Sequence, residues 1–112
     1  KMIRKYQPKI VLCNAVDDRH IDHPKGSKLV SDACFLSGLL KVPSAIEGKP
    51  QEKWRPSQVY HYIQWKNSVP DFVIIESIEY RANDLGRLIG VEHAEGFTSE
   101  RYVAIENLDK LI

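Results

Sequence analysis

The densest group of side chains that could do chemistry lies between residues 18 and 24, where the chain reads Asp-Arg-His-Ile-Asp-His-Pro. It holds two imidazoles, His20 and His23, and two carboxylates, Asp18 and Asp22. Imidazole is the commonest neutral zinc ligand and also titrates near pH 7. A nearby carboxylate can accept the ring N–H and fix the tautomer. We therefore expect one histidine to bind a metal and the other to handle a proton or a developing oxyanion.

A second interpretation stays open, because a solvent-exposed loop with two surface histidines has the same sequence. A catalytic zinc ion needs about three protein ligands in addition to water, and this loop supplies one or two. The other cluster of carboxylates and histidine is Glu92-His93-Ala94-Glu95. Spacing alone does not decide between the two interpretations.

The elements around this loop predict an α/β unit. A helix over Met2–Tyr6 ends before Pro8, and the apolar run Lys9–Asn14 predicts a strand buried on both faces. After the polar loop, a helix is expected over Lys25–Leu40. Its expected apolar stripe consists of Leu29, Ala33, Leu36 and Leu40. The loop would then lie at the carboxyl end of a buried strand, where open α/β sheets bind ligands.

The second half of the chain predicts further strands and one amphipathic helix. Strands are expected at Val59–Gln64, Phe72–Ile75 and Tyr102–Ile105. Glu76–Ile89 predicts a helix that Gly90 closes, followed by a loop over Val91–Ser99 and a turn or helix over Asn107–Ile112. His61 alternates with two tyrosines, so we expect a structural role for it. Cys13 and Cys34 are expected to pack as small apolar residues.

Length and composition exclude several classes of protein. A chain of 112 residues makes one small α/β domain, and 43% hydrophobic residues argue against disorder. The net charge of +1 gives no basic excess for nucleic acid. The apolar runs are too short to span a membrane, and no apolar segment follows Lys1-Met2-Ile3-Arg4 as in a signal peptide. Two cysteines make no disulfide framework, so we expect a cytoplasmic protein with reduced thiols.

Several segments together resemble the LmbE-like (PIG-L) N-deacetylases. They are Tyr6–Val11, Asp18–His23, Leu29–Phe35 with Gly38-Leu39, Trp54–Pro56, Tyr60–Gln64, and Leu85-Gly86 with Gly90–Glu100. The similarity covers nearly the whole chain. It is greatest to the bacterial branch that deacetylates N-acetylglucosaminyl-malate in bacillithiol synthesis. The combination of the Arg-His-x-Asp-His loop with the Glu-Gly-Phe tail is more specific than either motif alone.

The resemblance implies a role for each residue that matches the family's motifs. His23 matches a zinc ligand, with one zinc ion expected per chain. His20 matches the histidine that protonates the leaving amine or stabilises the tetrahedral intermediate, and Asp22 matches the carboxylate that orients it. The residues expected near the substrate are Arg19, Arg55 and His93. The family also implies a Rossmann-like three-layer fold with a mostly parallel sheet, and a homo-oligomer, which candidate surface aromatic residues also favour.

Two departures from the family pattern concern segments that the family has and this sequence lacks. The family's Ala-His-Pro-Asp-Asp motif, which supplies two zinc ligands and the general base, is absent. The segment Asp71–Ile74 also runs almost directly into Ile75-Glu76-Ser77, where the family has a long stretch. We therefore expect residues 1–112 to be the C-terminal portion of a longer chain, lacking an N-terminal part and a segment near residues 74–76. Ile21 stands where the family most often has Pro.

The sequence thus predicts zinc-dependent hydrolysis of the N-acetyl group of an N-acetylglucosamine conjugate, with release of acetate. The expected substrate is a small acetylated sugar, and neither nucleic acid nor membrane is an expected partner. One alternative is a deacetylase of the same family for another N-acetylated sugar, which a shared fold cannot separate. The other is a non-catalytic α/β assembly domain, for which no bound metal and no His–Asp contact within the loop are expected.

Overall fold

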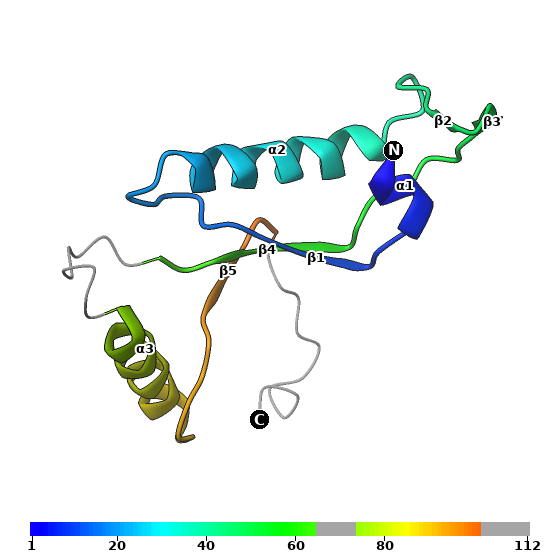
Figure 1. The fold of residues 1–112 in the computed structure, drawn as a ribbon. Coiled ribbons are helices and arrows are strands. Elements are labelled where there is room, and N and C mark those ends of the chain that lie inside the picture. The colour runs from blue at the N-terminus through cyan, green and yellow to red at the C-terminus, as the bar shows by residue number, and fades with distance from the viewer. Residues whose placement is uncertain (65–73, 102–112) are drawn as a thin grey trace.

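A computed structural model describes residues 1–64 and 74–101, and Figure 1 shows the arrangement of their elements. The helices are α1 (Met2–Tyr6), α2 (Asp22–Ser37) and α3 (Ile74–Ile89). The strands are β1 (Ile10–Cys13), β2 (Ala45–Ile46), β3 (Lys49–Pro50), β4 (Gln58–Tyr62) and β5 (Phe97–Ser99). None of the helices in these residues is both long and apolar enough to cross a lipid bilayer.

The main sheet is small and mixed. Its strand order is β1-β4-β5, and β2 and β3 form a separate antiparallel pair. Strands β1 and β4 run parallel, with Cys13 opposite His61, whereas β4 and β5 run antiparallel, with His61 opposite Thr98. The predicted α/β class is confirmed. In the described part of the chain the sheet has one parallel and one antiparallel pairing, rather than a mostly parallel arrangement.

Helix α2 covers one face of the sheet, as Figure 1 shows. The core between them is formed by Cys13, Cys34 and Val59, with Ile3, Val11 and Val30 packed against it. Both cysteines are free thiols buried in this layer, in the packing role that the sequence predicts. The core therefore lies between α2 and the paired strands β1 and β4.

The opposite face of the sheet is apolar and exposed. Ile10 is 57% exposed and Leu12 is 51% exposed. Tyr62 and Phe97 lie on the same face, with ring centroids 5.0 Å apart. The prediction that Lys9–Asn14 is buried on both faces is therefore wrong for the described residues, because only the face bearing Val11 and Cys13 is covered by a helix.

Helix α2 begins and ends three residues earlier than predicted. The sequence places Pro24 before the helix, but this residue lies in the first turn, where proline is tolerated because that turn's N–H groups have no intrahelical partner. The predicted apolar stripe is also wrong: Leu29 is 70% exposed and Leu36 is 44% exposed. Small side chains pack on the sheet instead, among them Ser27, Cys34 and Ser37.

A buried arginine joins α1 to the C-terminal end of α2. Arg4 donates from Nε to the Ser37 carbonyl at 2.9 Å and from Nη2 to the Leu39 carbonyl at 2.7 Å. Its Nη1 reaches the Ser44 hydroxyl at 2.9 Å. A cation at a helix C-terminus satisfies carbonyl groups that lack intrahelical partners. The three bonds fix α1 against the end of α2.

The second half of the chain departs from the sequence predictions in two places. Ile74 and Ile75, predicted as the end of a strand, lie in α3. Gly90, predicted to close this helix, follows it with a φ of 76°. Phe97–Ser99, predicted as loop, forms β5. The remaining predictions, for residues 72–73, 102–105 and 107–112, lie outside the described residues.

Candidate functional site

The loop between β1 and α2 places a buried carboxylate against a histidine ring. Nδ1 of His23 lies 2.6 Å from Oδ2 of Asp18, whose side chain is only 2% exposed. The other carboxylate oxygen of Asp18 accepts the backbone N–H of His20 at 3.0 Å. An aspartate that accepts the N–H two residues ahead makes an Asx turn. Asp18 therefore has two roles: one carboxylate oxygen shapes the loop, and the other orients the His23 ring.

The same contacts set the charge of Asp18. Burial acts to raise the pKa of this carboxyl. The hydrogen bonds from the His20 N–H and the His23 ring outweigh burial, so the pKa lies below its ordinary value. An ionised Asp18 accepts the Nδ1 proton of His23, which leaves the Nε2 lone pair of His23 available to a ligand.

His20 lies beside His23 but is held differently. The two ring centroids are 5.4 Å apart with an angle of 50° between the ring planes. His20 is anchored by its backbone N–H, and both residues face solvent, with the His23 side chain 47% exposed. The arrangement therefore presents two imidazoles side by side, one of which has its tautomer fixed by a carboxylate.

Asp22, predicted to orient His20, is placed away from this contact. Its side chain is 88% exposed, and its ion pair is with Lys25 at 3.8 Å, one turn further along α2. The carboxylate that contacts a histidine ring in the described residues of this loop is Asp18. Asp18 belongs to the predicted cluster, but the sequence assigns no role to it. Arg19 lies in the same loop.

Arg55 and His93 are not brought to the loop. Arg55 stacks on the Phe35 ring at 5.0 Å. Phe35 lies roughly 18 Å from His23 along α2, at about 1.5 Å per residue. His93 is exposed and belongs to the segment between α3 and β5. Figure 1 shows this segment on the other side of the sheet from the β1–α2 loop. In this structure neither side chain reaches the two imidazoles.

The donor set of the loop fits one metal ligand. His23 has a carboxylate partner on Nδ1, as zinc-binding histidines commonly have, and this partner orients its ring. In residues 1–64 and 74–101, no group of three or more His, Cys, Asp or Glu side chains could hold a metal ion. The described residues therefore offer a ligand with its supporting carboxylate, without a complete coordination sphere.

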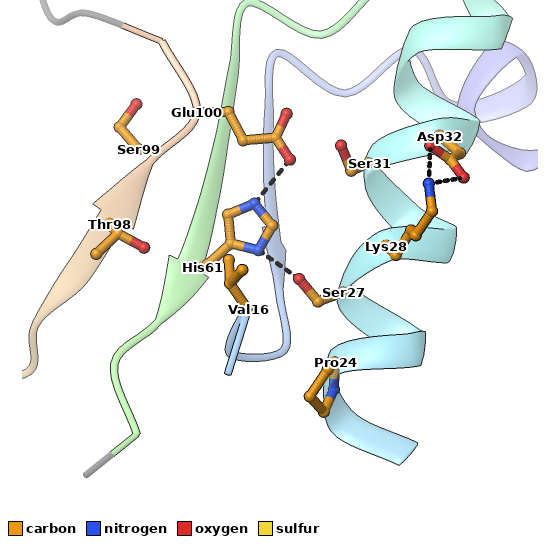
Figure 2. Close-up of a pocket in the computed structure, with 10 residues that line it drawn as sticks. All are labelled: Val16, Pro24, Ser27, Lys28, Ser31, Asp32, His61, Thr98, Ser99 and Glu100. Carbon is orange, nitrogen blue, oxygen red and sulfur yellow. Dashed lines mark hydrogen bonds and ion pairs between the residues drawn. The ribbon is translucent and has the colours of Figure 1, made fainter. Parts of the chain in front are cut away.

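A second polar cluster lies in a cavity between α2 and the sheet. The cavity measures about 570 Å³, and Figure 2 shows the residues that line it, from α2, β4, β5 and the loops beside them. His61, expected to be structural, is only 3% exposed and contacts Ser27 and Glu100 through its two ring nitrogens. In the sequence, the one sign of this cluster is a histidine on the inward face of a strand. Its two partners lie 34 and 39 residues away along the chain, so no local pattern indicates them.

Comparison with known proteins bears on the fold. No model of a known protein family matches this chain. The structure is similar to the crystal structure of the conserved protein TT1542 from Thermus thermophilus, with a TM-score of 0.77 and 22% sequence identity. The match covers 96% of this chain and 58% of that protein. This chain therefore shares its α/β fold with a little over half of the Thermus protein.

Proposed function

We propose that this chain carries part of the active site of a zinc-dependent N-deacetylase. The observation that supports the proposal is the Asp18–His23 pair, placed in the loop after β1 beside the parallel strand β4. A carboxylate, histidine and metal in series is a recurring arrangement in zinc enzymes. The loop also lies where open α/β sheets bind their ligands.

His23 would hold the zinc ion through Nε2, and Asp18 would orient His23. Zinc, when bound, polarises an amide carbonyl and lowers the pKa of its bound water. The further ligands and the general base would lie outside the described residues, since no group of three potential ligands occurs within them. The role of Asp18 here extends the expectation from sequence, which assigned the orienting carboxylate to Asp22.

His20 would transfer a proton to the leaving amine. Its ring lies 5.4 Å from that of His23, close enough for both to face one small substrate. As the C–N bond of the acetamide breaks, an imidazolium at His20 can donate a proton to the amine nitrogen. Asp22 would act on His20 only if its exposed carboxylate turned away from Lys25.

The proposed substrate is an N-acetylglucosamine conjugate, with N-acetylglucosaminyl-malate of bacillithiol synthesis as the first candidate. This choice rests on the resemblance to the LmbE-like deacetylases. The same resemblance underlies the proposals of a Rossmann-like three-layer fold, a homo-oligomer and a cytoplasmic location. The similarity to the Thermus protein supports the fold alone.

The proposal is tested by acetate release from N-acetylglucosaminyl-malate by the protein at its full natural length, loaded with zinc. We expect His20→Ala to lower kcat by about 100-fold or more, the contribution of a positioned general acid, while bound zinc is unchanged. Lys25→Ala, which alters an exposed ion pair of the same helix turn, is the matched control and should keep its activity. Unchanged kcat in His20→Ala would contradict the role given to His20.

A second candidate function, a non-catalytic assembly domain, is favoured by the exposed apolar face of the sheet, although the Asp18–His23 contact differs from the absence of a His–Asp contact expected for it. Ile10, Leu12, Tyr62 and Phe97 are each at least 38% exposed there. Large contiguous apolar patches on a protein surface mark interaction sites. This function predicts an oligomer that Leu12→Ser dissociates in sedimentation experiments, and no dependence of the protein on metal. A monomer at micromolar concentration would exclude self-assembly through this face.

A further inference from the structure

Three side chains from distant parts of the chain form a continuous hydrogen-bonded series. Oγ of Ser27 lies 2.8 Å from Nδ1 of His61, and Nε2 of His61 lies 2.7 Å from Oε1 of Glu100. Figure 2 shows His61 on β4 between Ser27 on α2 and Glu100, which follows β5. Ser27 and His61 are each 3% exposed. A hydroxyl, an imidazole and a carboxylate in this order are the parts of an activated nucleophile.

The surroundings of His61 provide partners for both protonation states of the ring. With Glu100 ionised, Nε2 carries a proton and donates it to the carboxylate, so Nδ1 accepts the hydroxyl proton of Ser27. If Nδ1 takes that proton, the carbonyl oxygen of Asn14, 3.1 Å away, can accept its N–H. A general base needs such support in both states.

The cavity distinguishes Ser27 from the other potential nucleophile, Cys13. Sγ of Cys13 also lies 3.1 Å from Nδ1 of His61. Burial, followed by the charges of Glu100 and Cys34, raises the pKa of the Cys13 thiol to about 11, so the reactive thiolate is scarce at neutral pH. Ser27 lines the cavity, and Cys13 is not among its lining residues. The hydroxyl of Ser27 is therefore the nucleophile that a bound molecule would meet.

The lining of the cavity indicates what it would accept. Its volume of about 570 Å³ lies within the range of small-molecule sites. Val16 and Pro24 give it an apolar wall. The charged residues that line it have partners: Lys28 and Asp32 pair with each other at 2.8 Å, and Glu100 contacts His61 at 2.7 Å. A small uncharged molecule suits this lining better than an ion does.

We propose that Ser27, His61 and Glu100 form a nucleophile, base and carboxylate series that hydrolyses small uncharged acyl esters. Oγ of Ser27 forms a bond to the ester carbonyl carbon, and its proton passes to Nδ1 of His61. The C–O bond of the ester breaks, and His61 returns the proton to the departing alcohol oxygen. Water then attacks the acyl-serine, gives a proton to His61, and releases the carboxylic acid while Ser27 regains its proton. The sum is ester plus water to acid plus alcohol.

This reaction requires no metal, which separates it from the deacetylase proposal. The test uses a fluorophosphonate probe, which phosphonylates activated serines, with the whole chain in EDTA. Peptide mass spectrometry then locates the adduct. We expect one adduct, on Ser27, in the folded protein, and its loss in urea. His61→Gln should slow labelling by about 100-fold, the usual contribution of a general base.

The matched control is Ser37→Ala. Ser37 is also a buried serine of α2, but its hydroxyl donates to the carbonyl of Cys34 and it does not line the cavity. Ser37→Ala should be labelled like the original protein, whereas Ser27→Ala should not be labelled. Absence of an adduct on Ser27 in the folded original protein would overturn the proposal, as would equal labelling in urea. This decisive comparison needs no variant to fold.

Discussion

The Nδ1 atom of His23 lies 2.6 Å from the Oδ2 atom of Asp18, whose side chain is almost completely buried. The contact joins the loop after β1 to the first turn of α2. It fixes the tautomer of a histidine whose other ring nitrogen is available to a ligand. The same aspartate accepts the backbone N–H of His20. One carboxylate thus contacts the ring of His23 and holds the backbone of His20.

The lowered pKa of Asp18 predicts a specific loss of stability in acid. A carboxyl whose pKa is lower in the folded state contributes stability that is present above its unfolded pKa of about 3.9 and is lost as the pH falls through the folded pKa. Urea denaturation of the original protein and of Asp18→Asn should therefore differ most near pH 7 and converge as the pH falls through the folded pKa of Asp18. Asp22→Asn, at an 88% exposed side chain, is the control with little effect. A constant difference across this pH range would contradict the account.

The hydrogen bonds of Arg4 predict a large stability effect far from the site. Arg4→Met should lower the free energy of unfolding by about 2–4 kcal/mol, because the bonds to Ser37 and Leu39 are lost and their carbonyls are left without this donor. Arg4→Lys keeps the charge but cannot form all three bonds, so we expect an intermediate loss. Urea denaturation measures both, and equal stability of Arg4→Met and the original protein would show that this contact is dispensable.

The buried thiols predict slow alkylation and a loss of stability at high pH. Burial, then the charge of Glu100, raises the pKa values of both cysteines, that of Cys13 to about 11. Iodoacetamide at pH 8 should modify the folded protein at least about 100-fold more slowly than the urea-unfolded chain. Between about pH 9 and 11 the thiolate forms only in the unfolded chain, so stability should fall as the pH rises through this window. Rapid labelling of the folded protein at pH 8 would contradict the observed burial.

Gly86 predicts a reversal of the usual effect of replacing a helical glycine. Gly→Ala within a helix ordinarily stabilises it by about 1 kcal/mol. At Gly86 an added Cβ would lie 2.6 Å from the Val91 carbonyl oxygen and 2.7 Å from that of Glu92, so the backbone must move. We expect Gly86→Ala to destabilise the protein by about 1–3 kcal/mol in thermal unfolding. Asn83→Ala, on the exposed face of α3, is the control and should be neutral or slightly stabilising.

Local signals in the sequence predicted much of the fold and the position of the loop. Pro8 marks the end of α1, the apolar run before Asn14 gives β1, and alternation at Val59 and His61 gives β4. The inward face of α2 could not be predicted, since the leucines make the more apolar stripe, yet small residues pack closest to the sheet. Strand β5 has three residues and depends on pairing with β4, which no local pattern encodes.

The candidate site is visible in the sequence as a cluster, but its pairing is not. Both carboxylates lie close to His23 along the chain, and spacing does not decide between them. The Asx turn at Asp18 directs its second oxygen to the His23 ring, while the start of α2 at Asp22 turns that side chain toward Lys25. The partners of His61 come from α2 and from the residue after β5, so only the tertiary structure brings them together.

The measurement that tests the central claim most directly is the zinc content of the protein at its full natural length, compared with two variants. We expect about one zinc per chain, lost in His23→Ala, with affinity lowered about 10- to 100-fold in Asp18→Ala, as for other carboxylate partners of zinc-binding histidines. Ser37→Ala, whose hydroxyl lies outside both candidate sites, should keep its zinc. If His23→Ala and Asp18→Ala bind zinc as tightly as the original protein, the pair is not a metal ligand and its support, and the deacetylase account is wrong.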